Sequence, residues 1–327
     1  MKLRLVSADD IAAALPMADC IKVTKQAFAD FTSGRAQVPQ RTVMALGDEE
    51  DDGTLLVKPA FIPEVGLGAK LVSVFPANAE HGLPVTPGIV ILLSPLTGEP
   101  EALLDGTFLT AWRTGAASGA ATDLLASPKA RVGAVFGAGS QARTQVLAID
   151  AVRDFEEIRI YARSEAAVAT LVAELGDSTR SRLIASSSPS QALDQADVVC
   201  TATTSKIPVF DGLHLKEGAH VNGVGSYTPQ MQEVDIETVL RSRVFVDSRD
   251  SAALEPGDLL EAVAAEITNP AEWTELGAVV LGDAPGRQQG DDLTFFKSVG
   301  LAVQDIAAGA RVLERAIERG LGRDLEF

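Results

Sequence analysis

The sequence predicts an α/β protein of two domains, one built on a doubly wound parallel sheet and the other of mixed α+β type. Three observations lead to this prediction. The chain has 327 residues, of which 46% are hydrophobic, enough to fill about two compact domains. Short β-rich runs separated by Gly, Pro and Asn occupy residues 41–104. From about residue 130 onward, apolar strands alternate with helical stretches, which is typical of a parallel sheet covered on both faces.

The first region begins with helix signals and continues as strands. From Ser7, a cap-like serine is followed by two acids, and apolar residues then recur at helical spacing, with a break near Pro16. Four β-rich runs follow, which we expect to pair antiparallel: RTVMAL, TLLVKPAFI, AKLVSVF and GIVILLS. Residues 1–125 are therefore predicted to form the α+β domain.

Residues 126–300 are predicted to form the parallel sheet and its helices. The runs that predict strands are RVGAVFG, IRIYARS, RLIASS, DVVCTAT, HVNGVG, RVFVDS and GAVVLGD. Beyond them, apolar residues from Val299 to Ile317, at steps of three and four, predict a long amphipathic helix that ends at Gly320 and Gly322. We expect residues 301–327 to return to the first domain.

A glycine-rich turn follows the first strand of the second region. Gly137, Gly139 and Ala142 fit G-x-G-x-x-A between the strand RVGAVF and the helix SQARTQVLAIDAV, the context of a dinucleotide-binding turn. The first glycine permits the turn, the second lets the backbone approach a pyrophosphate, and the helix N-terminus offers its amides to the phosphates. The sequence thus predicts a Rossmann-type domain, the alternative being an ordinary tight turn.

The end of the second strand indicates which nucleotide binds. An acid about 20 residues after the glycines would bind the ribose 2′-hydroxyl, but this strand ends in Arg163-Ser164. A guanidinium binds a 2′-phosphate through charge-assisted hydrogen bonds, whereas a carboxylate would repel it. The sequence therefore favours NADPH, with NADH possible. The alternative for Arg163, which Glu165 follows closely, is a solvated surface residue.

Three cations of the first region lie beside apolar or small residues: Arg41 in VPQRTV, Lys70 in GAKLVSV and Arg113 in TAWRTGAAS. A cation without a partner is costly to bury. In an acidic chain, these cations predict a small carboxylate ligand. For each cation taken singly, an ordinary salt bridge or a surface position is the alternative.

Composition limits the partners and the compartment. The 45 acidic and 28 basic residues give a net charge of −17, which would repel nucleic acid and anionic membranes. Cys20 and Cys200 are too few for a disulfide scaffold, and His81, His214 and His220 lack ligand spacing, so no metal is predicted. His81 is either a proton donor or a polar loop residue, the latter being the simpler interpretation. Without a recognisable signal peptide or membrane span, a cytoplasmic protein is expected.

Five long segments, in the same order, resemble the ornithine cyclodeaminase/μ-crystallin family: GAKLVSVFPAN, GLPVTPGIVILLSPLTGEPEALLDGTFLTAWRTGAAS, VFGAGSQA, VNGVGSYTPQMQEVD and DDLTFFKSVGLAVQD. The resemblance covers essentially the whole chain. It implies a homodimer whose first region, completed by the C-terminal helix, is the substrate-binding and dimerisation domain, and whose second region is the Rossmann domain.

The resemblance also implies roles for single residues. Arg41, Lys70 and Arg113 would form the catalytic set that holds the substrate carboxylate, with Lys70 near the reacting nitrogen and Val299 near the substrate. The residues expected to contact the cofactor are Thr86, Thr114 and Ser298 at the nicotinamide half, Gly137, Ala138, Gly139, Ser140, Gln141 and Ala142 in the turn, Arg163 and Ser164, and Thr201, Ala202, Thr203, Val224 and Gly225 at strand ends.

One departure from the family pattern points to the reaction. The cyclodeaminases have a catalytic aspartate where this chain has Ser226, so the full cyclodeaminase cycle is not expected. Its last step remains, the reduction of a cyclic ketimine carboxylate such as Δ1-pyrroline-2-carboxylate or Δ1-piperideine-2-carboxylate to proline or pipecolate, which needs a carboxylate clamp, a hydride donor and a proton. The alternatives are a dehydrogenase of an acyclic amino acid such as alanine, a true cyclodeaminase, and a nucleotide-binding protein of crystallin type without turnover.

Overall fold

The computed structural model describes residues 2–47 and 53–326, and the chain divides into two compact units. Unit 1 comprises Met1–Arg113 and Leu301–Phe327, and unit 2 comprises Thr114–Gly300. The first division falls within helix α3 (Gly106–Leu125), which ends at the boundary predicted between residues 125 and 126.

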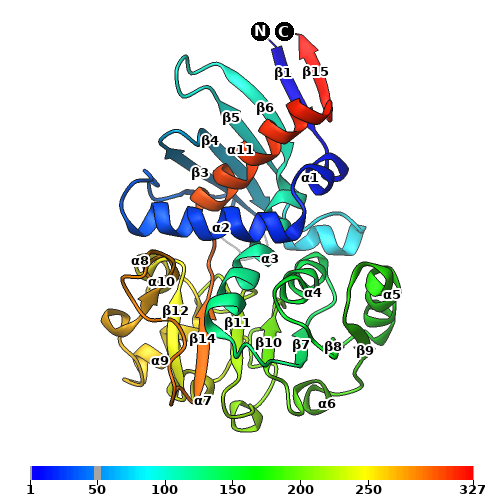
Figure 1. Cartoon of the computed structure of the whole chain (residues 1–327), viewed down its shortest axis with the longest axis vertical. Helices are drawn as coiled ribbons and strands as arrows, with labels where there is room; N and C mark the ends of the chain where they lie inside the picture. Colours follow the sequence, from blue (N-terminus) through cyan, green and yellow to red (C-terminus); the bar gives the residue numbers. More distant parts are fainter. Residues whose placement is uncertain (1, 48–52, 327) are drawn as a thin grey trace. The chain divides into compact units, whose positions relative to one another are not determined.

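Unit 1 contains a seven-stranded sheet in the order β15-β1-β6-β5-β4-β3-β2. The four predicted strands are β2 to β5, and they pair antiparallel as expected. Strand β1 pairs parallel with β6 and antiparallel with β15, so the two ends of the chain lie side by side (Figure 1). The bounds are β1 (Lys2–Val6), β2 (Thr42–Ala45), β3 (Thr54–Ile62), β4 (Gly66–Val74), β5 (Gly88–Leu93), β6 (Pro100–Asp105) and β15 (Arg323–Glu326).

Helix α11 (Ala302–Arg319) covers one face of this sheet. It packs on β3, β4 and β5, and it also contacts α1 (Ala8–Ala14) and α2 (Met17–Thr32). Glycines of β4 allow the close approach, because a Cβ at Gly66 would lie 3.2 Å from Ala310 Cβ and one at Gly68 would lie 3.0 Å from Ile306 Cδ1. The predicted C-terminal helix thus belongs to unit 1, and it ends at Gly320 in the left-handed conformation.

Unit 2 contains an eight-stranded sheet in the order β13-β12-β14-β11-β10-β7-β8-β9, and all its strands are parallel. The chain moves outward from β7 to β9 and then returns to the other side of β7 with β10. This reversal is the topological switch point at which α/β sheets bind ligands. The bounds are β7 (Val132–Phe136), β8 (Glu157–Tyr161), β9 (Arg182–Ala185), β10 (Val198–Thr201), β11 (His220–Gly223), β12 (Ser242–Val246), β13 (Thr274–Glu275) and β14 (Leu293–Lys297).

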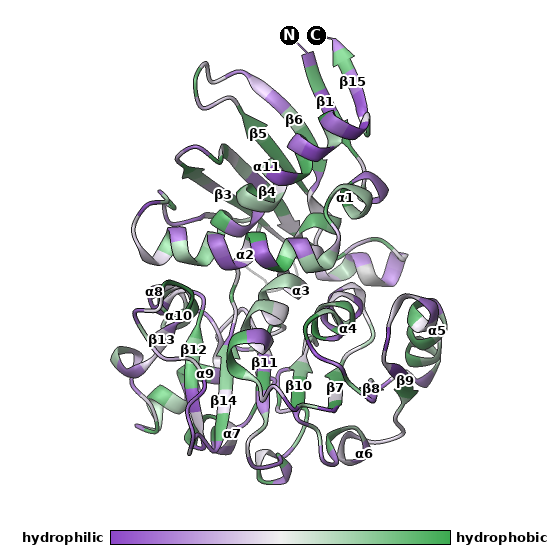
Figure 2. Cartoon of the chain, viewed as in Figure 1, coloured by the Kyte–Doolittle hydropathy of each residue, from purple (hydrophilic) through white to green (hydrophobic). Residues whose placement is uncertain are grey.

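Both faces of the parallel sheet are buried, which confirms the predicted α/β class. Ala134 and Phe136 of β7 pack in one hydrophobic cluster, and Val135 between them packs in another on the opposite face. Figure 2 shows the strands of this sheet as largely hydrophobic. The helices are α4 (Ser140–Val152), α5 (Glu165–Leu175), α6 (Pro189–Leu193), α7 (Ile236–Leu240), α8 (Arg249–Ala252), α9 (Gly257–Ala264) and α10 (Leu276–Leu281).

One predicted strand is wrong. GAVVLGD, residues 277–283, forms most of α10, which ends at Gly282 with φ of 81°. A short apolar run does not distinguish a strand from a buried helical turn by its periodicity, and the glycine acts here as a helix C-terminus. The strand beside β11 is instead β14, LTFFK, which is buried along its whole length.

Candidate active site

Two lysines face each other on the sheet of unit 1. Lys58 of β3 lies directly opposite Lys70 of β4 in the antiparallel register, and both side chains are buried on the face that α11 covers. Residues opposite each other in such a register have Cβ atoms about 4.5–5.5 Å apart. The alternation of strand residues thus places two amines side by side in the interior of unit 1.

Asp305 of α11 links two of the buried cations. Lys70 Nζ lies 2.9 Å from Asp305 Oδ1, and Arg113 Nε donates to the same oxygen at 2.9 Å. Lys70 Nζ also donates to Thr110 Oγ1 at 3.1 Å, and Arg113 Nη1 donates to Gln304 Oε1 at 3.0 Å. These contacts join residues from β4, α3 and α11, so three elements hold the cations in place.

Burial and neighbouring charges shift the pKa values of the side chains in this cluster. Burial lowers the pKa of Lys70 to about 8, with Asp305 opposing the shift and Arg113 and Arg41 adding to it. The pKa of Lys58 is driven well below its ordinary value, first by burial and then by the charge of Lys70. Burial would raise the pKa of Asp305, but Arg113, Lys70 and Lys58 outweigh it and hold that pKa low.

The cluster carries more positive than negative charge. Lys58, Lys70, Arg113 and Arg41 act on one another, and Asp305 is the acid that acts on both lysines. Lys70 and Arg113 already share that carboxylate. A small carboxylate would interact favourably with these cations. The structure thus brings together the three cations that the sequence singled out.

The glycine turn of unit 2 lies at the switch point of the parallel sheet. Gly137 has φ of 120°, and a Cβ there would lie 2.5 Å from the carbonyl oxygen of Ala202, so only glycine fits. Gly139 caps α4, and a Cβ there would meet no atom of the described chain within 4 Å. Ala142 is fully buried, as a small third residue of the fingerprint should be.

Further features of the turn fit a dinucleotide. The backbone at Gly139 is open on the side where a pyrophosphate approaches in such folds. In the first turn of α4, the buried Gln141 Oε1 has no hydrogen-bond partner within the described chain. Ala138 and Ser140 complete the turn between β7 and α4. The residues present therefore fit a pyrophosphate at this helix N-terminus.

The other predicted cofactor residues of unit 2 follow the carboxyl ends of parallel strands, which lie on one edge of the sheet. Arg163 is exposed two residues after β8, and Ser164 caps α5 through a hydrogen bond from Ala167. The remaining residues at this edge are Thr201, Ala202 and Thr203 after β10, Val224 and Gly225 after β11, and Ser298 after β14. Thr114 is buried within α3, and Thr86 lies in unit 1, exposed before β5.

Glu233 ties two of these strand ends together. Its fully buried carboxylate accepts hydrogen bonds from Thr201 Oγ1 at 2.9 Å, and from Thr203 N and Oγ1 at 2.6 and 2.8 Å. The same carboxylate accepts from Gly225 N at 2.7 Å and Ser226 N at 3.2 Å. Five donors on one carboxylate fix the loops after β10 and β11 relative to each other.

Asp247 plays a similar part after β12. Its Oδ2 accepts from Ser298 Oγ at 2.9 Å, Val299 N at 2.9 Å and Gly300 N at 2.7 Å. This buried carboxylate thus fixes the segment that holds two predicted site residues. Val299 itself is buried and belongs to unit 2.

Ser226 is a buried loop residue. Its Oγ donates to the Met231 carbonyl at 2.6 Å, and its amide donates to Glu233. A carboxylate at this position would put an acceptor in place of the hydroxyl that donates to the Met231 carbonyl. The serine therefore fits a loop built around the neighbouring acid.

Four buried residues were missed by sequence reasoning: Lys58, Glu233, Asp247 and Asp305. Lys58 lies in a run taken as a plain strand, and Asp305 reads as an ordinary acid in the first turn of a helix. The sequence offered one signal, and only for Lys58. In an alternating strand, this charged residue occupies a position expected to face the interior. His220 is a structural residue, because its ring bonds Thr294 and Asn222 and burial lowers its pKa to about 3.

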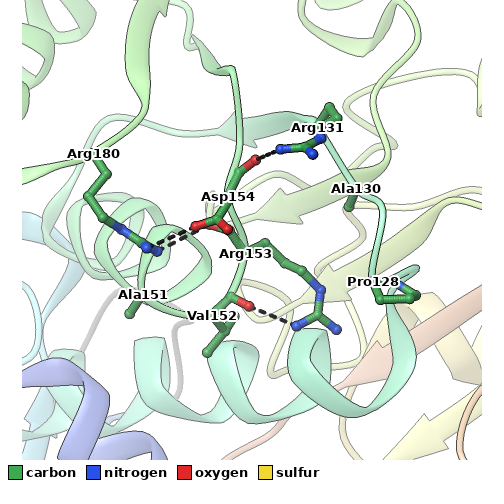
Figure 3. A pocket seen from close by; sticks show the side chains of 8 residues that line it. All are labelled: Pro128, Ala130, Arg131, Ala151, Val152, Arg153, Asp154 and Arg180. Atoms are coloured by element: carbon green, nitrogen blue, oxygen red, sulfur yellow. Dashed lines mark hydrogen bonds and ion pairs between the residues drawn. The ribbon is translucent and has the colours of Figure 1, made fainter.

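A separate pocket is lined by Arg131, Arg153 and Arg180, whose side chains bond to neighbouring parts of the protein (Figure 3). Arg131 and Arg180 donate to Asp154, and Arg153 donates to carbonyls at the end of α3, including those of Thr122 and Ala126. Backbone carbonyls, helix ends and nearby acids thus account for these guanidinium groups without a ligand.

Two classes of site find no support in the described part of the chain. Residues 2–47 and 53–326 contain no group of histidine, cysteine and acidic side chains placed to hold a metal ion. Among the helices that the structure describes, none has both the length and the apolar character needed to span a bilayer.

The parallel sheet with its glycine turn is that of a dinucleotide-dependent oxidoreductase. The chain belongs to the ornithine cyclodeaminase/mu-crystallin family, whose sequence profile matches residues 1–320. It is 35% identical to a Delta(1)-pyrroline-2-carboxylate reductase of Bacillus cereus over 326 residues, covering 99% of each chain.

Two solved structures show the same fold over the whole chain. The Delta(1)-pyrroline-2-carboxylate reductase of Thermococcus litoralis, in complex with NADH and L-proline, has a TM-score of 0.94 and 34% identity, covering 98% of this chain and 100% of that one. An archaeal alanine dehydrogenase dimer with bound NAD has a TM-score of 0.90 and 30% identity, covering both chains fully.

Proposed function

We propose that the protein is an NAD(P)H-dependent reductase of cyclic ketimine carboxylates, converting Δ1-pyrroline-2-carboxylate to L-proline or Δ1-piperideine-2-carboxylate to L-pipecolate. The observation that carries the proposal is the buried pair of Lys70 and Arg113 on the carboxylate of Asp305, with Arg41 close enough for its charge to act on Lys70. The reductases of Bacillus cereus and Thermococcus litoralis, similar to this chain over nearly its full length, support it.

The reaction balances with one hydride and one proton. A bound nicotinamide cofactor supplies the hydride to the imine carbon, and the nitrogen takes a proton, so that C=N becomes CH–NH and the cofactor is oxidised. Arg41 and Arg113 bind the substrate carboxylate, since a planar guanidinium matches its two oxygens. Lys70, fixed by Asp305 and Thr110, adds a positive charge close to the same carboxylate.

At the carboxyl edge of the parallel sheet, Gly137–Ala142 would hold the pyrophosphate of the cofactor. Thr201–Thr203, Val224–Gly225, Ser298, Thr114 and Thr86 contact its other parts, and Val299 contacts the substrate. Arg163, which makes no hydrogen bond or ion pair to any residue the structure describes, binds the 2′-phosphate of NADPH. NADH is also accepted, in keeping with the NADH and NAD found in the two structural relatives.

A dehydrogenase of an acyclic amino acid is the second candidate. The likeness to an archaeal alanine dehydrogenase favours it, because both reactions reduce or form a C=N bond beside a carboxylate. A true cyclodeaminase is disfavoured, because Ser226 offers no carboxylate base and its hydroxyl is bonded to the Met231 carbonyl. A crystallin-type protein without turnover would not need the buried cation cluster.

The sheet of unit 1 offers a surface for a second copy of the chain. Its face opposite α11 carries partly exposed apolar residues on neighbouring strands, among them Leu55, Val57, Phe61, Leu71, Ile89 and Ile91. A hollow of about 940 Å³ lies on this face, lined by Leu71, Ile89 and Leu103 with others. We infer a homodimer through this face, working in the cytoplasm, where its two free, buried cysteines stay reduced.

One assay tests the proposed function. Purified protein is mixed with NADPH or NADH and, in turn, with Δ1-pyrroline-2-carboxylate, Δ1-piperideine-2-carboxylate, pyruvate with ammonia, or ornithine with NAD. We expect rapid oxidation of NADPH with a cyclic ketimine and no ammonia from ornithine. Faster turnover with pyruvate and ammonia would favour the dehydrogenase, and ammonia and proline from ornithine would restore the cyclodeaminase.

A further inference from the structure

The strand order of unit 2 sets the direction in which a bound dinucleotide would extend. The glycine turn follows β7, and Arg163, the residue proposed for the 2′-phosphate, follows β8 on one side of it. On the other side of β7 come β10, β11 and β14, in that order. A dinucleotide binds across the point where the strand order reverses, so its nicotinamide half is expected at the ends of these three strands. Ser298 is the first residue after β14.

Asp247 lies beside Ser298 at this edge of the sheet. Strands β12 and β14 pair parallel, and their last pair is Val246 with Lys297, so Asp247 and Ser298 are the next residues in the register. The side chain of Asp247 is fully buried, and the exposed fraction of Ser298 is 3%. Strand pairing thus brings a carboxylate next to a hydroxyl.

The Asp247 carboxylate accepts hydrogen bonds on both of its oxygens. Oδ1 accepts from Ser248 N at 2.9 Å. Oδ2 accepts from Ser298 Oγ at 2.9 Å, Val299 N at 2.9 Å and Gly300 N at 2.7 Å. Backbone N–H groups can only donate, so the carboxylate is the acceptor at both oxygens. In the contact with Ser298, the hydroxyl is therefore the donor.

This contact uses the one proton of the Ser298 hydroxyl. A serine hydroxyl has one proton and two lone pairs, so with its proton directed at Asp247 the oxygen can only accept from a ligand. Within the part of the chain that the structure describes, Ser298 Oγ accepts no hydrogen bond. Its backbone is held as well, because Ser298 N donates to the Gly223 carbonyl at 3.1 Å. The oxygen is thus an acceptor at a fixed position.

We propose that Asp247 is a positioning residue that makes Ser298 a hydrogen-bond acceptor for the carboxamide NH2 group of the nicotinamide. The assignment rests on the part of the proposed function that brings a nicotinamide dinucleotide to this edge. A carboxamide has a donor end and an acceptor end, so a fixed acceptor selects one of its two orientations. Asp247 thus acts through Ser298 on the specificity for a dinucleotide that carries a carboxamide.

The first test compares two dinucleotides that differ only at this group. In the 3-acetylpyridine analogue of NAD, a methyl ketone replaces the carboxamide, so the NH2 donor is lost and the carbonyl oxygen is kept. Kd values are measured by calorimetry without substrate, using the 2′-phosphorylated pair if the wild type prefers NADPH. We expect the wild type to bind the carboxamide form about 10-fold more tightly than the analogue. Ser298→Ala should lose most of this preference.

Ser242→Ala is the matched control for that variant. The Ser242 hydroxyl also donates to an acceptor of the protein, the Thr238 carbonyl at 2.6 Å, but it lies where β12 begins, at the opposite end of the strand from Asp247. We expect Ser242→Ala to keep the wild-type ratio of the two Kd values.

The second test separates positioning from structural support. A purely structural Asp247 would affect the binding of both dinucleotides by the same factor, whereas a positioning residue changes their ratio. In Asp247→Leu no carboxylate holds the Ser298 proton, and we expect the preference to fall below about threefold. Asp247→Asn, whose carbonyl oxygen still accepts that proton, should retain most of it. Adding Ser298→Ala to Asp247→Leu should change the ratio little further.

Three outcomes would overturn the proposal. Equal binding of both dinucleotides by the wild type, or a preference that persists in Ser298→Ala, would remove Ser298 from the carboxamide contact. An Asp247→Leu variant with an unchanged ratio would make Asp247 a structural residue. If Asp247→Leu does not fold, Asp247→Ser replaces it, because its shorter side chain also withdraws the acceptor. Failure of the wild type to reduce any cyclic ketimine, with the binding preference intact, would refute the proposed function and leave this assignment standing.

Discussion

Asp305 supplies the negative charge that the buried cations Lys70 and Arg113 share. Both of its neighbours, Lys70 and Arg113, are almost fully buried, and each lies 2.9 Å from its carboxylate. Removing one member of such a group leaves an uncompensated charge in the interior, which costs about 3–5 kcal/mol. The stability of each buried charge in the cluster therefore depends on the others. Substitutions that keep the charge are for this reason more informative than truncations.

The pKa of about 8 for Lys70 predicts how anion binding depends on pH. Below this pH the ammonium is charged and adds to the carboxylate clamp, and above it the charge is lost. We expect the Kd for pyrrole-2-carboxylate, an anion of matching shape, in Lys58→Met, where only one of the two facing amines remains, to rise roughly tenfold as pH increases through this range. The Lys58→Met/Lys70→Arg variant should show no such rise, and a rise of equal size there would assign the titration to another group.

Arg163 predicts the choice between nicotinamide cofactors. Losing a charge-assisted contact to the 2′-phosphate costs about 1.5–3 kcal/mol, so Arg163→Ala should raise the KM for NADPH about 10- to 100-fold and leave that for NADH nearly unchanged. Arg182→Ala, at an exposed arginine where β9 begins, is the matched control. Equal use of both cofactors by the wild type, unaltered by Arg163→Ala, would make Arg163 a surface residue.

At this scale, sequence reasoning found some members of the cluster and missed others. Arg41, Lys70 and Arg113 each lie beside apolar residues, a local signal. Asp305 carries no such signal, because its partner Lys70 lies 235 residues away and only the packing of α11 on β4 brings them together. The pairing of Lys58 with Lys70 depends on strand register, which a single sequence does not reveal.

At the scale of elements, the loops after β10 and β11 depend on Glu233. The strands themselves pair through their backbones, but Thr201, Thr203, Gly225 and Ser226 are joined beyond the strand ends by this one carboxylate. Asp258 holds the other side of the residue, since its carboxylate accepts from Glu233 N at 2.6 Å and pairs with Lys297 of β14. A buried polar network thus shapes the sheet edge where the cofactor is proposed to bind.

Glu233→Gln tests this network. An amide nitrogen would replace an oxygen that accepts two or more hydrogen bonds, leaving buried donors facing each other at a cost of about 1–3 kcal/mol each. We expect a lower Tm and a rise of roughly tenfold in the KM for the dinucleotide. Asp235→Asn, the same change at the cap of α7, should lower Tm without that rise. A Glu233→Gln variant with unchanged cofactor KM would show that the loops hold their shape without the carboxylate.

The strands of unit 2 show where sequence patterns suffice at this scale. RVGAVFG and DVVCTAT are read correctly because each is a short apolar run bounded by turn residues, and RVGAVFG is also followed by a helical pattern. The prediction of a strand at GAVVLGD was wrong. The six residues of α10 complete fewer than two helical turns, too few for periodicity to distinguish a helix from a strand. LTFFK was not singled out as a strand, because acids precede it and it ends in a lysine, so the apolar run is short. Lys297 is nevertheless buried, because it pairs with Asp258.

At the scale of the whole molecule, unit 1 has two unlike sheet faces. One is covered by α11, and the other carries alternate apolar residues of β3 to β6 that the described chain covers only in part. Figure 2 shows β4 and β5 as largely hydrophobic. Large exposed apolar faces are uncommon on monomers and mark interfaces. A net charge of −17 opposes self-association, so the proposed dimer requires that burial of this face outweigh the repulsion between copies.

Dimerisation through this face is tested by placing a charge on it. Leu71→Glu or Ile91→Glu would put a carboxylate into the apolar contact, and an unpaired buried charge costs several kcal/mol. By size-exclusion chromatography with light scattering, we expect the wild type at twice the chain mass of 34.2 kDa and each variant at the monomer mass. Leu213→Glu, on a side chain of unit 2 that is 68% exposed, should remain a dimer. A monomeric wild type would refute the dimer, and a Leu71→Glu variant that stays dimeric while Leu213→Glu dissociates would move the interface away from the unit 1 sheet.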